Sequence, residues 1–184
     1  MAKAVSSAVG SQPATMMLAS TDGLLRVEFR WHGDRYQHFF LAGPTPPQEA
    51  TPSSEAGPGS LLGESVEGDA EHDWPPSPPI QQLSAETIDG ENVLLGVGAA
   101  GKSHWSISVE TRTVDNVPLL RFELACRCPA TPPRLGSVYK IDPQLTLEPL
   151  DSAVREDCRP NLAIRPAMTS ESTFRWSYLV RRSK

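Results

Sequence analysis

Apolar and polar residues alternate through much of this chain, most regularly over residues 92–128. Apolar side chains at odd positions from Trp105 to Val109 alternate there with polar ones such as Ser106. A period of two residues is typical of a β-strand that buries one of its sides. The Asp-Asn pair at 115–116 favours a turn, and the alternation then resumes as far as residue 128. We therefore predict three consecutive strands of one antiparallel sheet over this stretch.

The same period recurs in shorter stretches at residues 25–31, 36–41, 136–141, 145–147 and 173–181. Turn-forming residues separate them, and segments with a helical period are rare. The pattern predicts an all-β fold: a single antiparallel β-sandwich or barrel of about eight strands. Periodicity does not separate sandwich from barrel. At most one short helix is expected, near 152–158, with Ser152 as its N-cap.

Residues 43–79 differ in composition from the rest of the chain. They hold nine of the 18 prolines and seven acidic residues, and they contain no Lys or Arg. Such a segment buries too little apolar surface to offset the entropy of ordering it. We expect a flexible acidic Pro-rich insertion in a single β domain spanning 21–184, with a stiff spacer at 75–79. Residues 1–20 are expected to form a disordered leader.

Charge and cysteine content narrow the possible partners and compartment. The formal net charge is −5, which argues against a general nucleic-acid binder because such proteins need a basic surface. No apolar run is long enough to span a membrane as a helix, so no membrane partner is expected. The three cysteines are an odd number and no secretion signal is evident, which favours a reducing compartment and predicts a cytoplasmic protein.

Residues 96–103 match the phosphate-binding loop pattern G-x-x-x-x-G-K-[ST]. In that motif backbone amides hold the phosphates, and an α-helix must follow the loop at once. Here the next residues alternate with a period of two, so we expect a strand after Lys102. The interpretation that we favour is a Gly/Ala connection between antiparallel strands. A nucleotide-dependent enzyme that uses the 96–105 loop is kept as an alternative.

Two other clusters have the residue types of a metal or catalytic site. Cys126 and Cys128 share one strand face, and Cys158 completes a possible thiolate set. Their spacing is not that of a structural zinc site, and both strand cysteines continue an apolar face, so core packing is the better interpretation. His32, Asp34 and His38 surround the first hairpin, where a turn and a packed imidazole are expected. We predict no metal, no cofactor and no catalytic residue.

The function is predicted only as a class. We expect a binding or interaction module without catalysis, whose partner is an unidentified protein or small molecule. The alternatives are a β-barrel that encloses a small ligand and a nucleotide- or metal-dependent enzyme. Glycine lets a ligand approach the backbone closely, so a site is sought first at the glycine-rich loop. The candidate ligand-binding residues are Gly98, Gly101, Lys102, Ser103, His104, Trp105 and His38.

Overall fold

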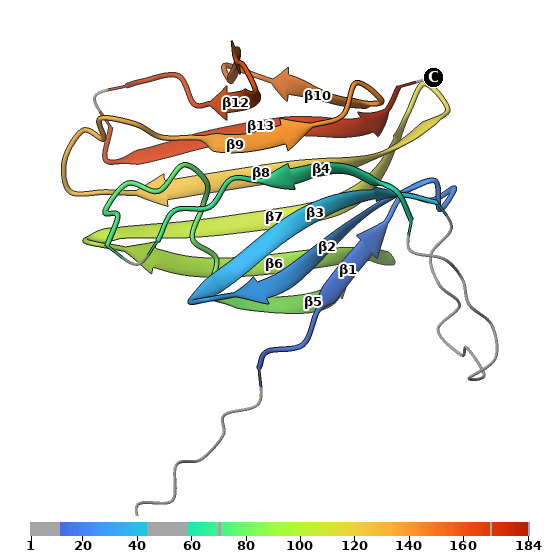
Figure 1. Ribbon diagram of the computed structural model, residues 1–184, viewed down its shortest axis with the longest axis horizontal. Helices are drawn as coiled ribbons and strands as arrows, with labels where there is room; N and C mark the ends of the chain where they lie inside the picture. The colour runs from blue at the N-terminus through green and yellow to red at the C-terminus, as the bar shows by residue number, and fades with distance from the viewer. Residues whose placement is uncertain (1–11, 44–58, 70, 170, 184) are drawn as a thin grey trace, which may run out of the picture.

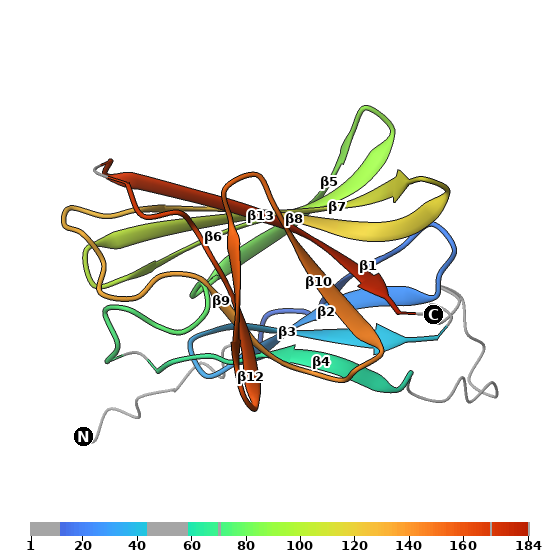
Figure 2. The same ribbon diagram turned by 90° about the horizontal axis from the view of Figure 1, so that it is seen from above.

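Two antiparallel β-sheets build the fold (Figures 1 and 2). The computed structural model describes residues 12–43, 59–69, 71–169 and 171–183. These residues form thirteen strands and contain no helix, which confirms the predicted all-β class. Nearly all neighbouring strands in the middle of the chain are joined by short turns, as the alternating pattern predicts.

The seven-stranded sheet has its strands in the order β1-β2-β3-β4-β9-β12-β11. Their bounds are β1 Met16–Ala19, β2 Leu25–His32, β3 Arg35–Ala42, β4 Leu61–Ser65, β9 Ser137–Ile141, β12 Asn161–Arg165 and β11 Val154–Cys158. The six-stranded sheet has the order β10-β13-β8-β7-β6-β5. Its strands are β10 Leu145–Leu150, β13 Thr173–Arg182, β8 Val117–Arg127, β7 Ser103–Val114, β6 Glu91–Ala100 and β5 Gln82–Ile88.

The two sheets face each other across one hydrophobic core, as Figure 2 shows. Aromatic rings from both sheets fill its middle. Phe40 of β3 lies 5.7 Å from Phe122 of β8, and Phe122 stacks on Tyr178 of β13 with ring centroids 5.1 Å apart. Buried rings of this kind supply much of the apolar area that drives folding.

In β7 the core side is the side that alternation predicts. In β7 the odd residues Trp105, Ile107 and Val109 are buried, whereas the even residues between them are exposed or half-buried. The predicted hairpin of β7 and β8 is also confirmed, with Val114 paired to Val117 across the turn. Asp115 and Asn116 occupy that turn with positive φ angles, a conformation that these residue types tolerate.

The strand count is higher than the predicted number of about eight. Strand β1 extends the sheet into the region predicted as a leader, and β4 lies within the segment predicted as a flexible insertion. β4 is held on both sides, by β3 and by β9, and Lys140 Nζ lies 2.9 Å from Glu64 Oε1 across the second pairing. Pairing with distant strands thus overrides a composition that argues for disorder. Residues 44–58 and 70 of the predicted insertion, and 1–11 of the predicted leader, lie outside the described residues.

The helix predicted near 152–158 is wrong. Val154–Cys158 is strand β11, which pairs with β12 along its whole length, from Val154 opposite Arg165 to Cys158 opposite Asn161. A helix of two turns is marginal by itself, so a neighbouring strand with free hydrogen-bonding groups decides the outcome.

The Pro-rich run at 75–79 is packed into the fold. Pro75, Pro78 and Pro79 are buried, and Ser77 is fully buried. The Ser77 hydroxyl donates a hydrogen bond to the Val138 carbonyl (3.0 Å) and accepts one from the Val138 amide (3.1 Å). The run is therefore a fixed part of the core boundary, and the predicted role as a spacer is wrong for these residues.

Candidate functional site

The loop that matches the phosphate-binding pattern is a tight β-hairpin. Strands β6 and β7 pair up to Ala100 and Ser103, and Gly101 and Lys102 form the turn between them. β7 starts at Ser103, so the strand predicted after Lys102 is confirmed. The helix N-terminus that a phosphate-binding loop needs is replaced by a strand.

Two glycines of this loop make room for other parts of the chain. A Cβ atom at Gly98 would lie 1.8 Å from the carbonyl oxygen of Pro79, so the Pro-rich run needs a glycine there. Gly101 has a positive φ of 54°, and a Cβ there would lie 2.4 Å from Asp73 Oδ1. Close packing against residues 73–79 therefore accounts for both glycines without a ligand.

The remaining residues predicted to bind a ligand are dispersed. Ser103 and Trp105 are buried, and the Trp105 ring makes an edge contact with Trp176 in the core. His104 is exposed on the outer face of the six-stranded sheet, the face turned away from the core. Lys102 is exposed in the turn. These side chains do not converge on one cavity.

His38 belongs to a buried polar chain that links the two sheets. Its Nε2 atom lies 2.7 Å from the Tyr139 hydroxyl, which in turn is hydrogen-bonded to the Tyr178 hydroxyl. Burial lowers the pKa of His38 to about 3, so the imidazole is neutral at physiological pH. Burial also raises the pKa values of both tyrosines. This chain satisfies polar groups inside the core, which supports the predicted packed histidine.

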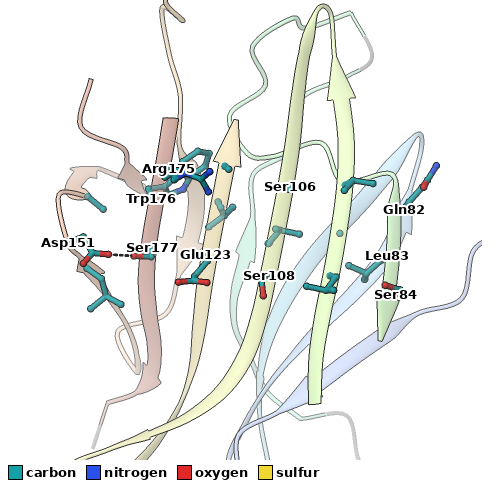
Figure 3. A pocket seen from close by; sticks show the side chains of 18 of the residues that line it. Gln82, Leu83, Ser84, Ser106, Ser108, Glu123, Asp151, Arg175, Trp176 and Ser177 are labelled. Carbon is teal, nitrogen blue, oxygen red and sulfur yellow. Dashed lines mark hydrogen bonds between the residues drawn. The ribbon is translucent and has the colours of Figure 1, made fainter. Parts of the chain in front are cut away.

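A groove of about 800 Å³ lies on the outer face of the six-stranded sheet (Figure 3). Its floor consists of small side chains, among them Ser106, Ser108 and Ala125. Leu95 and Val97 of β6 form an apolar side. The turn between β10 and β11 forms the opposite side. Small residues in the middle of a sheet face, with larger ones beside them, produce the hollow.

Strand register arranges the groove residues in two parallel rows. One row runs Gln82, Val97, Ser106, Ala125 and Arg175 across β5, β6, β7, β8 and β13. The second row lies two residues further along each strand. It runs Ser84, Leu95, Ser108, Glu123, Ser177 and Leu150, and so reaches β10. Residues two apart on one strand share a face, so both rows point to the same side.

Along this face some charged side chains have an ion-pair partner and others have none. Arg112 and Arg121 contact Glu110 at 2.8 and 3.5 Å, and Arg121 also contacts Glu123 at 2.5 Å. Arg175, in the groove, has no hydrogen-bond or ion-pair partner among the described residues. The Ser177 hydroxyl donates to Asp151 Oδ2 at 2.9 Å and so holds the turn at the groove wall. One uncompensated cation therefore lies within the groove.

A smaller hollow of about 370 Å³ lies beside Glu67, Asp69, His72, Trp74 and Arg134. Glu67 Oε1 accepts a hydrogen bond from Ser65 Oγ at 2.5 Å, whereas Oε2 is shielded from solvent and has no partner among the described residues. Burial raises the pKa of Glu67 to about 7. A carboxyl that titrates near neutral pH is common at functional sites, but buried structural carboxyls show the same shift.

The cysteines do not come together as a thiolate set. Cys126 and Cys128 are buried in the core, and Cys158 is exposed at the end of β11 in the other sheet. Burial raises the pKa of Cys126 to about 12, which keeps it a neutral thiol. Among the residues that the structure describes, no three His, Cys, Asp or Glu side chains are grouped as a metal site would require.

Comparison with protein-family models, with curated proteins and with solved structures gives no match, so the site has to be argued from the geometry of this chain alone. The described part of the chain also holds no helix that is long and apolar enough to cross a membrane.

Sequence reasoning placed the groove residues on strands but did not single them out as a site. Ser106, Ser108 and Ser177 alternate with core residues, so they count as an ordinary solvent-facing side. The signal that distinguishes them is side-chain size. An exposed strand face normally carries long charged or β-branched residues, and a row of Ser and Ala marks a place where something else can approach the backbone.

Proposed function

We propose that this protein is a binding module without catalysis, and that its ligand is a small molecule held in the outer groove of the six-stranded sheet. The observation that carries the proposal is the groove itself. Its volume of about 800 Å³ falls within the range of small-molecule sites, roughly 300–1,000 Å³. Its apolar side provides contact area for a ligand, and its small polar floor and single unpaired cation can fix the ligand's orientation.

The lining residues favour binding over chemistry. Among the described residues that line the groove, none is a histidine or cysteine, so its serines lack a base that could activate them. Its two carboxylates already have partners: Glu123 contacts Arg121, and Asp151 accepts from Ser177. The exposed position of Lys102 and the strand that follows it support the binding module over the nucleotide-dependent alternative.

A groove outside the sheets is favoured over an enclosed ligand because rings fill the space between them. His38, Phe40 and Tyr139 of one sheet pack against Phe122 and Tyr178 of the other. We accordingly propose a two-sheet sandwich as the architecture, with each sheet keeping its own hydrogen-bond ladder. The free cysteines support a reducing compartment, the cytoplasm, as its location.

The test uses three eight-carbon probes, octanoate, 1-octanol and octylamine, titrated into ¹⁵N-labelled protein. Molecules of about ten heavy atoms are expected to bind in about the millimolar range. At least one probe should shift amide signals of β6, β7, β8 and β13 in a saturable way. Ser106→Phe, which fills the floor, should weaken that binding at least tenfold.

The matched control is Thr113→Phe, an exposed position on the same strand beyond the groove. It should leave the dissociation constant within about twofold of the unmodified protein, an expected change for a distant surface position. If no probe saturates, or if Ser106→Phe and Thr113→Phe behave alike, the groove is not the binding site and the proposal fails.

A further inference from the structure

We infer that the groove ligand is a small amphipathic organic acid, with its carboxylate at Arg175 and its aliphatic part along β8, β7 and β6. This inference rests on the proposed function, since it names the ligand class for the same groove. The occupant is a free monocarboxylic acid with an aliphatic chain.

Two arginines on the outer face of β13 differ in whether they have an acidic partner. Arg175 and Arg181 both lie on β13 and both point outward, at positions six residues apart. Arg181 has an acidic partner, Glu148, at 3.7 Å. Arg175 has none among the described residues, although it lies in the hollow where an acid could be held. A guanidinium without a partner is suited to a carboxylate, which it can bind through two parallel hydrogen bonds.

Neighbouring charges reinforce this end of the groove. Arg127 and His104 face each other across β8 and β7, one row beyond the row of Arg175, and both are exposed. Arg127 also lacks a hydrogen-bond or ion-pair partner among the described residues. Arg127 therefore adds a second cation one row beyond Arg175, at this end of β8. An anionic group is attracted to that end.

The two acidic residues of the groove determine at which end the ligand's carboxylate can lie. Glu123 lies in the neighbouring row and is held by Arg121, while Asp151 lies at the wall next to Leu150. A carboxylate placed beside either one would be repelled, whereas one at Arg175 avoids both positions. Figure 3 shows the Glu123 carboxylate and the Arg175 guanidinium pointing to different ends of the groove.

The remaining floor fits an aliphatic chain. From Arg175 the same row continues through Ala125 and Ser106 to Val97, which is half exposed. This path crosses three strand spacings, a length of about 14 Å. Small side chains along it let a methylene chain approach the sheet, and Leu95 flanks its far end. Burial of each methylene there contributes up to about 0.8 kcal/mol.

The experiment compares octanoate, 1-octanol and octylamine on three proteins: the unmodified chain, Arg175→Gln and the control Arg181→Gln. Octanoate should bind more tightly than octylamine. Arg175→Gln should weaken octanoate binding about fivefold, the size of a partly exposed ion pair, and leave 1-octanol unchanged. Arg181→Gln should change neither. Raising the salt concentration should weaken octanoate binding and leave the affinity for 1-octanol unchanged.

Each outcome separates the inference from the proposed function. If 1-octanol binds in the groove but octanoate is insensitive to Arg175→Gln, or octylamine binds more tightly, the groove binds small molecules and the acid assignment is wrong. If none of the probes binds, the proposed function itself fails. Self-association of the protein that Ser106→Phe abolishes, measured by sedimentation, would show that a second copy occupies this face and would overturn the inference.

Discussion

The inner and outer faces of the six-stranded sheet are built by the same strands and differ mainly in the size of their side chains. On the inner face, Phe122 stacks on Tyr178 of the neighbouring strand β13, and Trp105 meets Trp176 of β13 across β8. On the outer face, Ser106 and Ala125 leave a groove at corresponding points of the same strands. Alternation with a period of two therefore produces two different surfaces, one that stabilises the fold and one that is open to a ligand.

Polar groups on the two faces also differ in how they are satisfied. Inside, Trp176 Nε1 donates to Ser137 Oγ at 3.0 Å and His38 is linked to two tyrosines, whereas the buried Trp105 Nε1 has no partner among the described residues. A buried polar group without a partner costs about 1–3 kcal/mol, which favours such pairing. Outside, Arg175 carries a full charge without a partner among the described residues, because water compensates it. The outer face tolerates an unpaired charge because solvent reaches it.

The largest expected contrast between the faces comes from two neighbouring residues of β8. Phe122→Ala removes a fully buried ring that stacks on Tyr178, and should lower the free energy of unfolding by about 3–5 kcal/mol. Glu123→Ala truncates an exposed side chain whose ion pair lies at the surface, and should cost less than about 1 kcal/mol. Urea unfolding followed by fluorescence measures both. Similar losses would mean that the outer face also contributes to a packed interface.

The inner face was largely predictable from sequence, because alternation over 25–31, 36–41 and 92–128 identifies which apolar residues face the core. Short strands were not. β4 contains a glycine and an acid and depends on β3 and β9 for pairing, and β11 has no buried residue at all. These short strands form because they pair with strands that are distant in the sequence. The local pattern of residues carries no information about that pairing.

The groove escaped prediction for a related reason. Gly98 and Gly101 resemble a ligand loop by spacing, yet both serve close packing against residues 73–79. Ser106 and Arg175 are 69 positions apart in the numbering and share a row only because β7, β8 and β13 pair in one register. The register across three strands depends on tertiary structure, so the sequence pattern alone could not reveal this row.

The second contrast tests the packing role of Gly98 on the inner side of β6. Gly98→Ala introduces a Cβ atom against the Pro79 backbone, which has to move, and should lower stability by about 2–3 kcal/mol. Ala99→Ser changes the adjacent half-buried residue, whose side chain lies on the opposite face, and should cost under about 0.5 kcal/mol. Thermal unfolding in the absence of nucleotide is the measurement. An unchanged melting temperature for Gly98→Ala would contradict the packing account of this glycine.

The smallest effect concerns the pH dependence of the buried titratable groups. The pKa of His38 is lowered from its ordinary 6.5 to about 3, so the native state binds fewer protons there than the unfolded chain. Its contribution to stability is complete above pH 6.5 and is lost as the pH falls toward 3. The pKa of Glu67 is raised from 4.5 to about 7, which has the opposite sign. Its contribution is complete below pH 4.5 and is lost as the pH rises toward 7.

Between pH 5 and 6.5 the two dependences should nearly cancel, because both groups act with a slope of about 1.4 kcal/mol per pH unit. Stability of the unmodified protein should therefore be almost flat there. In Glu67→Gln only the titration of His38 remains, so the free energy of unfolding should rise by about 2 kcal/mol from pH 5 to 6.5. In His38→Gln only the titration of Glu67 remains, so the free energy of unfolding should fall by a similar amount. Urea unfolding at several pH values measures how the free energy of unfolding changes with pH. A loss of stability that is the same at every pH does not alter this slope. Parallel curves for the two variants would contradict the opposite pKa shifts of Glu67 and His38. Arg175→Gln, on the outer face of the six-stranded sheet, leaves both His38 and Glu67 in place and should leave the curve flat.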